Sequence, residues 1–404
     1  MTSGDVSVTR FVTETPWARM PLLYSLFARL PGAAIGVLLP LLGLSGGMSA
    51  TVSASAFAAC RIAQALAGPA WGKLVDRTGL TLIVPVVGCC FAGSVAVLAV
   101  IPLSPVVLVA MAAVIGALTL PMSALMRALW NRSLESANHR DAANSIESLM
   151  SEVVLLLGRV LVAVAALLVS LPHLVLLQAA VAVAGSIGLA STVLVRTDPG
   201  TERRSANHRK LSQVRSRTSL FACFLLFSGS LGAYSLALIL LVDTITADYA
   251  ATLSASAIAV WGLGSVVGLT LGRLSSVTLH HRSGCILLLL ATAVLQLLAV
   301  VGHFGPVFLL LSAFLAGLPI SAILTGLYAQ LGAAVPLHQH TEYFAWATTM
   351  IFAGDAAGAL AVGIVNDLVS GSLAAVAVAA GASVSAAIAA AISLRSNTHP
   401  SPAV

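Results

Sequence analysis

Residues 72–101 read GKLVDRTGLTLIVPVVGCCFAGSVAVLAVI, a short charged stretch followed by a long apolar run. From residue 81 to residue 101 the run contains no Asp, Glu, Lys or Arg. An α-helix needs about 20 apolar residues to cross the hydrocarbon core of a bilayer. The charges of Lys73, Asp76 and Arg77 come just before the run, where a spanning helix would meet water. We therefore predict a transmembrane helix over residues 81–101.

The composition extends this interpretation to the whole chain. Hydrophobic residues make up 59% of the 404 positions and charged residues only 8%, whereas soluble domains carry about 25% charged residues because their surface faces water. Long unbroken apolar runs also exclude a transmembrane β-barrel, whose strands alternate between lipid-facing and lumen-facing residues. The cysteines have no metal-ligand spacing and are interpreted as reduced packing residues. They are Cys60, Cys89, Cys90, Cys223 and Cys285.

Twelve apolar stretches follow one another along the chain, each long enough to span a bilayer. We place them near residues 19–43, 48–70, 81–101, 105–127, 143–169, 173–195, 219–242, 252–273, 284–302, 306–330, 342–366 and 371–394. The chain is therefore predicted to be an all-α membrane protein with twelve transmembrane helices.

Lys and Arg are distributed unevenly between the two sides of these spans. They precede span one, follow span twelve and occur in joints after even-numbered spans, whereas the six joints after odd-numbered spans contain none. Joints rich in Lys and Arg stay in the cytoplasm. We therefore expect a multi-pass protein of the cytoplasmic membrane with both termini in the cytoplasm. The net charge of +6 is then a topology signal, and no soluble domain is predicted that would carry a nucleic-acid surface.

Two similar halves are predicted from sequence repeats. LPMSAL at 120–125 recurs as LPISAI at 318–323, and the GxxxG-Lys pattern at 68–73 recurs with Arg at 268–273. Paired repeats with a substrate site between them are a common transporter architecture.

The longest hydrophilic stretch separates these halves. Residues 196–218 are polar, basic and too short for a domain, so we predict a flexible cytoplasmic linker. We expect an N-terminal six-helix bundle over residues 1–195 and a C-terminal six-helix bundle with a short cytoplasmic tail over residues 219–404.

The segment between spans two and three, GKLVDRTG, resembles the G-x-L-x-D-R-x-G loop of the major facilitator superfamily. The stretches 126–130 and 341–346 are similar to a bacterial, efflux-type branch of that superfamily. The resemblance implies two pseudo-symmetric six-helix bundles, the major facilitator fold. It also implies a cytoplasmic gating loop, with an ordinary basic turn as the alternative. The loop residues are Gly72, Asp76, Arg77 and Gly79.

Three details qualify this resemblance. It implies that Asp76 faces the start of span eleven, near Thr341 and Glu342. Arg127 lies at the predicted end of span four, around the joint to span five, and span four lacks the membrane-embedded Arg that many proton-coupled members carry. Span five carries Gly158-Arg159 where exporters of the antiporter type commonly carry Gly-Pro. The last two departures weaken an assignment as a drug–proton antiporter.

Several ionisable residues inside the predicted spans are candidates for transport or coupling. They are Arg29, Arg61, Glu147, Glu152, Arg159 and Asp355. A charge in mid-span is costly, so such groups face a wet cavity or an opposite charge. Their positions along the spans predict two ion pairs, Arg29–Glu152 within the first half and Arg61–Asp355 between the halves.

Each of these charges also has a structural alternative. If Glu152 is tightly paired, it has a structural role and is a poor proton carrier. Arg159 lies seven residues after Glu152, on the same helix face but two turns away. Glu147 would then be the titrating group, or would simply be solvated near the cytoplasmic end. Asp355 lies in the segment GDAAG at 354–358, which suits close helix packing as well as gating.

Polar side chains in spans one, seven and ten are candidates for a substrate cavity. They are Tyr24, Tyr234, Thr325 and Tyr328. Aromatic residues near span ends are also common as interface anchors. The histidines are interpreted as solvated loop residues, and no phosphate-binding glycine loop is present, so we expect neither a metal nor another cofactor. A gradient, such as that of protons, would drive the protein.

These patterns predict a secondary transporter rather than an enzyme, since no span presents a Ser-His, Cys-His or metal-ligand constellation. The expected partners are a small-molecule substrate and the lipid bilayer, and the resemblance implies a monomer. The leading interpretation is export of a small amphipathic solute or drug-like metabolite by proton antiport. Proton-coupled uptake of a small solute by symport is the alternative within this class. A non-transporting membrane receptor or assembly factor is the alternative outside it.

Overall fold

The computed structural model describes residues 14–134, 168–194, 218–245, 250–274, 282–334, 340–369 and 372–396, together with scattered positions between 136 and 165. The regular elements in this part of the chain are helices. They are η1 (Pro16–Ala18), α2 (Arg19–Ser45), α3 (Ala50–Thr78), α4 (Leu80–Val100), α5 (Pro105–Ala117), α6 (Met122–Ser133), α8 (Leu171–Leu194), α9 (Thr218–Ile245), α10 (Ala250–Leu274), α11 (Arg282–Leu297), η2 (Leu298–Phe304), α12 (Pro306–Gly317), α13 (Ile320–Ala334), α14 (His340–Val369) and α15 (Ser372–Ser396).

Most of the predicted spans correspond to helices of the structure. Within the described residues, nine helical segments are long and apolar enough to cross a membrane, and two shorter apolar helices, Thr252–Gly268 and Gly284–Val300, accompany them. Together they coincide with eleven of the twelve predicted spans. The other predicted span, 143–169, lies mostly outside the described residues. The all-α membrane fold predicted from composition is confirmed.

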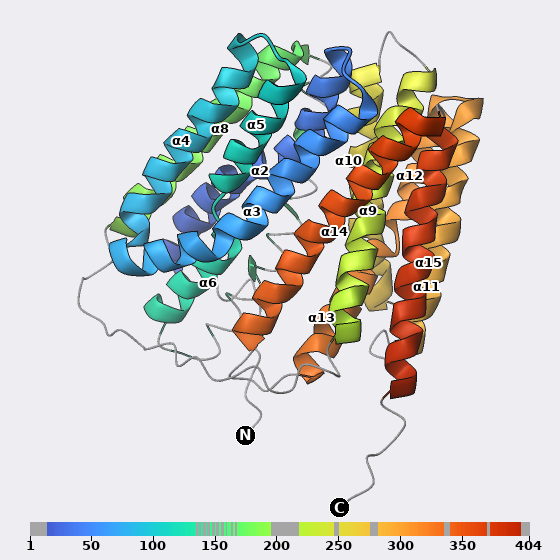
Figure 1. Ribbon diagram of the computed structural model, residues 1–404. Helices are drawn as coiled ribbons and strands as arrows, with labels where there is room; N and C mark the ends of the chain where they lie inside the picture. The colour runs from blue at the N-terminus through green and yellow to red at the C-terminus, as the bar shows by residue number, and fades with distance from the viewer. Residues whose placement is uncertain are drawn as a thin grey trace, which may run out of the picture.

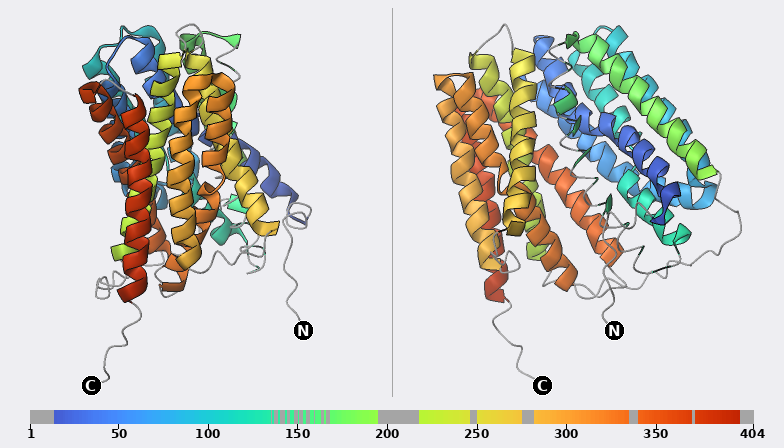
Figure 2. Two further views of the ribbon diagram at one scale, coloured as in Figure 1. Left: turned by 90° about the vertical axis from the view of Figure 1, so that its right-hand side faces the viewer. Right: turned by 180° about the vertical axis from the view of Figure 1, so that it is seen from behind.

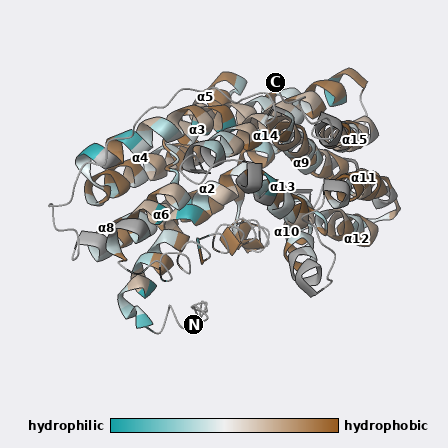
Figure 3. Cartoon of the chain, turned by 90° about the horizontal axis from the view of Figure 1, so that it is seen from below, coloured by the Kyte–Doolittle hydropathy of each residue, from teal (hydrophilic) through white to brown (hydrophobic). Residues whose placement is uncertain are grey.

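Apolar side chains cover the outside of the helices. Leu66 is 75% exposed and Val106 is 78% exposed, and hydrophobic residues run along most of the helices in Figure 3. Contiguous apolar surface of this extent is uncommon on soluble monomers. In a bilayer the same apolar side chains would face the hydrocarbon core, where their exposure is favourable.

The helices form two groups, which Figure 1 and Figure 2 show side by side. In the first group α8 packs against α2 and α4, and α5 packs against α3. In the second group α9 packs against α14 and α15, α11 against α15, and α10 against α12. The largest described contact between the groups is the crossing of α3 with α14. This crossing therefore joins the two halves that the repeats predicted.

The two ends of the bundle differ in charge. We call one of them the basic end, because α2 begins there with Arg19 and α3 ends there after Lys73 and Arg77. The last helix, α15, also ends at this side of the molecule (Figure 2). We call the opposite side the far end; it holds Ser49 and Asp367. The distribution of Lys and Arg predicts that the basic end faces the cytoplasm.

The predicted gating loop is mostly helical in the structure, which corrects the sequence interpretation. Helix α3 continues past Gly72 to Thr78, and only Gly79 lies outside it. Gly79 has φ +92° and donates its N–H to the Val75 carbonyl at 2.9 Å. A left-handed residue after the last helical turn is a common helix stop, and glycine adopts it without a steric penalty. Arg77 is exposed, and the side chain of Asp76 lies outside the described residues.

Spans four and ten are each broken, which the sequence analysis did not predict. Helix α5 ends at Ala117 and α6 begins at Met122, after Pro121. In the second half α12 ends at Gly317 and α13 begins at Ile320, after Pro319. Proline lacks a backbone N–H, so it cannot donate the hydrogen bond that would continue the helix at that position. The repeated Leu-Pro-x-Ser segment is therefore the site of a matched interruption in both halves.

At the far end, α14 supplies a cap for α3. The first N–H groups of a helix have no partner within the helix. Ser49 accepts a hydrogen bond from the N–H of Val52 at 3.3 Å, and the Asp367 carboxylate accepts one from the N–H of Thr51 at 3.1 Å. A carboxylate is also favoured at this position by the helix dipole. The two halves are thus hydrogen-bonded to each other at the far end.

Candidate functional site

A buried ion pair joins α2 to the region after α6. The Arg29 Nη2 atom lies 2.6 Å from Glu147 Oε2 and also donates to the Met122 carbonyl at 3.3 Å. The Arg29 side chain is 8% exposed and the Glu147 side chain is 0% exposed. The Trp130 Nε1–H donates to Glu147 Oε1 at 3.2 Å. The carboxylate therefore binds groups from two helices in the first half.

The partner of Arg29 differs from the one that the sequence predicted. Depth along the spans favoured Glu152, but the described partner is Glu147, which is fully buried rather than solvated. Glu152 and Arg159 lie outside the described residues. Depth alone could not choose between the carboxylates, because it does not say which way a side chain points around its helix.

A second arginine belongs to this cluster. Arg127 lies on α6 within span four, is half-buried, and interacts electrostatically with Glu147 and Arg29. It also interacts with Tyr328, which lies on α13 in the other half. The prediction that span four lacks an embedded arginine was therefore wrong, because Arg127 lies inside the apolar helical segment Pro105–Trp130. We call Arg29, Arg127, Trp130 and Glu147 the charged cluster.

A second ion pair connects the two halves. The Arg61 Nε atom of α3 lies 3.8 Å from Asp355 Oδ2 of α14, and the two side chains are 14% and 19% exposed. Arg61 also donates from Nη1 to Gln64 at 3.2 Å and lies over the Phe57 ring, 5.1 Å from its centroid. The ring of Phe352, on α14, lies 5.6 Å from the same guanidinium. The ion pair predicted for Arg61 and Asp355 is confirmed, whereas its role in gating stays a prediction.

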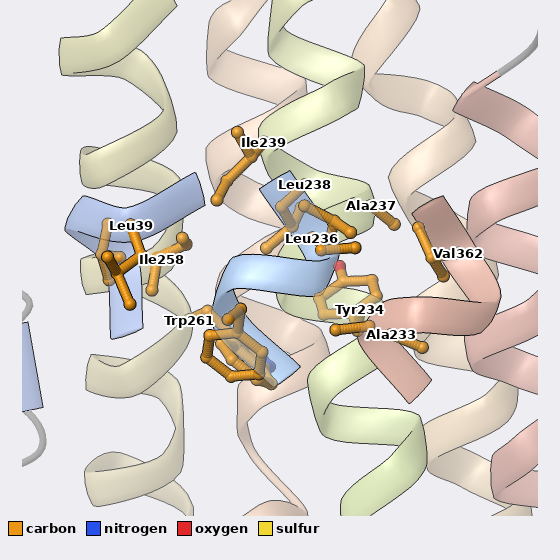
Figure 4. Close-up of a cluster of buried hydrophobic side chains, with 14 of the residues drawn as sticks. Leu39, Ala233, Tyr234, Leu236, Ala237, Leu238, Ile239, Ile258, Trp261 and Val362 are labelled. Atoms are coloured by element: carbon orange, nitrogen blue, oxygen red, sulfur yellow. The ribbon is translucent and has the colours of Figure 1, made fainter. Parts of the chain in front are cut away.

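The predicted cavity residues lie in different environments. Tyr24 is half-buried and packs against Gly188 of α8. Tyr234 is fully buried in the apolar cluster of Figure 4, with its ring centroid 5.5 Å from that of Trp261. Thr325 is exposed and donates to the Ser321 carbonyl at 2.7 Å. Tyr24 packs against the buried side chains that surround Trp130, and Tyr328 interacts electrostatically with Arg127, whereas Tyr234 lies in a different buried cluster.

The second half contains a buried polar network that the sequence analysis missed. Gln296 Nε2 of α11 donates to Ser230 Oγ of α9 at 2.8 Å, and Ser383 Oγ of α15 donates to Gln296 Oε1 at 3.1 Å. The two serine hydroxyls are 2.5 Å apart. Because each polar group has a partner, the network links three helices without leaving a donor unpaired. A glutamine inside an apolar run was the available sequence signal.

The sequence of this chain matches that of a known protein family. A sequence model of the Major Facilitator Superfamily matches residues 22–304. The chain belongs to the major facilitator superfamily. It is a membrane transporter and not an enzyme, as predicted. No curated protein matches the chain in sequence. Among the described residues, no three His, Cys, Asp or Glu side chains are grouped to hold a metal ion.

Solved structures of transporters share the fold at low sequence identity. The nucleoside transporter NupG is 15% identical with a TM-score of 0.66, over 94% of this chain and 100% of that chain. The POT family transporter PepTSo is 12% identical with a TM-score of 0.69, over 94% and 98%. The E. coli fucose:proton symporter FucP is 16% identical with a TM-score of 0.58, over 94% and 98%. At these identities the similarity establishes the superfamily fold and nothing about the substrate.

In this superfamily member we propose that the Arg61–Asp355 pair holds one access state. Asp355→Asn and Arg61→Gln are each expected to slow solute flux by about tenfold, which corresponds to about 1.4 kcal/mol in an equilibrium between states. The charge-swapped double variant Arg61→Asp/Asp355→Arg should recover part of the flux. Recovery is only partial, because the swap loses the contact of Arg61 with the Phe57 ring. Full solute flux in both single variants would contradict the proposal that this ion pair stabilises one access state.

Proposed function

We propose that this transporter is a monomer of the cytoplasmic membrane, with both termini in the cytoplasm, and exports a small amphipathic solute. The observation that supports it best is the charged cluster, buried within the first half and reaching Tyr328 of the second half. Alternating access works by movement of the two halves around a site between them. Charged groups that interact with both halves can respond both to a bound solute and to a movement of the halves.

The surroundings of the charged cluster favour a solute with an apolar body. Leu22, Met122, Met126 and Ile146 are buried in the same cluster of side chains as Trp130. A sugar or another hydrophilic nutrient would need many hydrogen-bond partners, because each unpaired polar group is costly to bury. An amphipathic solute needs only one polar contact, and the rest of its surface can face these side chains.

Proton antiport was the driving reaction suggested by the sequence, and Glu147 is the carboxylate of the charged cluster. Proton uptake by Glu147 would break its pair with Arg29 and leave a buried guanidinium without its counter-ion. Losing one partner of a buried pair is strongly unfavourable. Proton exchange at Glu147 therefore requires that Arg29 receives another anion in the same cycle. The second candidate function, proton-coupled uptake, is favoured by the structural similarity to a fucose:proton symporter.

Vesicles of both orientations separate export from uptake. We expect amphipathic solutes to accumulate in inside-out vesicles, in which the basic end faces the medium, when a membrane potential or a pH gradient is imposed. Accumulation confined to right-side-out vesicles would establish uptake in place of export. Selective collapse of the pH gradient, at constant potential, then decides whether protons are exchanged. An absence of solute movement in both orientations, with retained folding, would contradict transport and favour the receptor alternative.

A further inference from the structure

We propose that Arg29 binds a carboxylate of the transported solute, so that the solute is a small organic acid with an apolar body. This inference rests on the proposed transport function. It names the class of solute that the charged cluster would accept.

The first step is the incomplete set of partners around Arg29. A guanidinium carries five N–H donors on three nitrogens. In Arg29 the Nη2 atom donates to Glu147 and to the Met122 carbonyl. The Nε and Nη1 atoms are buried and have no hydrogen-bond partner among the described residues. Buried donors without an acceptor are rare and unfavourable. The side chain is only 8% exposed, so water cannot fully satisfy these two donors. They are therefore available to an acceptor that is not part of the described chain.

The second step is the sign of the charges around these donors. The described charged side chains of the cluster are two guanidinium groups, Arg29 and Arg127, and one carboxylate, Glu147. The vacant donors belong to a cation, so an anionic acceptor is attracted to them more strongly than a neutral one. In a medium of low dielectric constant this attraction is stronger than at a surface. A carboxylate accepts charge-assisted hydrogen bonds from a guanidinium, which are stronger than those between neutral groups.

The third step is the location of the vacant donors. Arg29 lies about ten residues from the start of α2, which places it roughly 15 Å into the bundle from the basic end at 1.5 Å per residue. Tyr328 of the other half lies within electrostatic range of Arg127. A solute bound at Arg29 would therefore sit deep in the membrane and near the junction of the halves. That is where transporter substrates bind.

An anionic solute also gives export a driving force. The cytoplasm is electrically negative, and moving one elementary charge across the membrane potential is worth about 2.3 kcal/mol per 100 mV. A carboxylate that leaves the cell gains this energy. Export of an organic acid therefore needs no proton to be carried by Glu147, which can keep its pair with Arg29.

Paired acids and amides test the inference, because they differ in charge and hardly in shape. The probes are benzoate with benzamide and hexanoate with hexanamide, added to the purified full-length protein. We expect both acids to raise the midpoint of thermal unfolding in a saturable manner, and both amides to leave it unchanged. Arg29→Lys keeps the charge but loses the Nε and Nη1 donors, so the acids should bind at least about tenfold more weakly. Equal stabilisation by acids and amides would overturn the proposal.

Two further variants protect the test against simple misfolding. The double variant Arg29→Gln/Glu147→Gln removes both charges of the ion pair, so neither member of the pair is left alone, and we expect it to fold and to lose acid binding. Arg19→Gln removes an exposed arginine from the same helix and should bind the acids normally. Unchanged acid binding in the double variant would overturn the proposal. Export of the amides without binding of the acids would contradict the carboxylate proposal and leave the proposed export function intact. Binding of the acids without any solute flux would support the carboxylate proposal and contradict the export function.

Discussion

Replacing Glu147 with leucine is expected to lower the free energy of unfolding by about 3–5 kcal/mol, the cost of leaving one member of a buried ion pair alone. The Arg29 side chain is 8% exposed, and its shortest polar contact is with Glu147. Arginine cannot shed its proton to escape the penalty. The loss is a large fraction of the total stability of an ordinary protein. Unfolding of the purified protein by heat or by a denaturing detergent measures it.

The double variant Arg29→Met/Glu147→Leu separates charge from packing. Exchange of a buried ion pair for apolar side chains of similar size is often neutral or stabilising. We therefore expect the double variant to regain part of the stability while solute flux stays lost. Recovery is incomplete, because Arg127 also loses its interaction with Glu147. Arg19→Gln, at an exposed position of the same helix, should change stability by no more than about 0.5 kcal/mol. A loss for Glu147→Leu no larger than that of Arg19→Gln would mean that the pair is not desolvated.

Gly363→Leu is expected to stop the transport cycle by keeping the far end open. A Cβ atom at position 363 of α14 would lie 2.6 Å from the Ala54 Cβ atom and 2.9 Å from the Ala50 carbonyl of α3. Backbone cannot move aside without separating the helices, and overpacking of this kind costs about 1–3 kcal/mol or more. Each 1.4 kcal/mol shifts an equilibrium about tenfold. The closed far end should therefore become about tenfold to a hundredfold less populated, and flux should fall accordingly.

Labelling from the far side checks the cause of that loss. Ala58 follows Ala54 by one helical turn and is 2% exposed. With the native cysteines replaced, a cysteine at position 58 should react faster with a membrane-impermeant maleimide in the Gly363→Leu variant. Gly381→Leu is the matched control, because a Cβ atom there meets nothing within 4 Å. Lost flux without faster labelling would show that Gly363 acts on something other than closure.

Much of the fold was predictable because hydrocarbon imposes length and apolarity on every span. Those two properties were enough to place eleven of the spans within a few residues. Length and apolarity did not predict the ends of the helices where a helix continues beyond the membrane boundary. The charges of Lys73 and Arg77 mark where water begins, but α3 continues as a helix beyond them until Gly79 adopts a positive φ. Pro121 was noted as part of a repeat, yet apolarity alone gave no sign that it interrupts the span.

The candidate sites were predictable only in part. Arg61 and Asp355 were paired correctly, because spans two and eleven face each other in the superfamily fold and the two residues lie at similar depth along them. The partner of Arg29 was predicted as Glu152, because a sequence gives depth along a helix and not the direction around it. Arg127, at the predicted end of span four, was counted with the basic residues around the following joint. In the structure a carboxylate and a second arginine accompany it inside the first half.

The interruptions before α6 and α13 divide spans four and ten into two rods each. A continuous helix can bend only if its backbone hydrogen bonds are distorted. A helix that begins after a proline can change its tilt at a lower cost, because a hydrogen bond is already missing at the break. Helix α6 carries Arg127 and, like α13, leads from its break toward the basic end of the molecule (Figure 1). We therefore expect these two short helices, one in each half, to control entry to the interior from that end by tilting at the break.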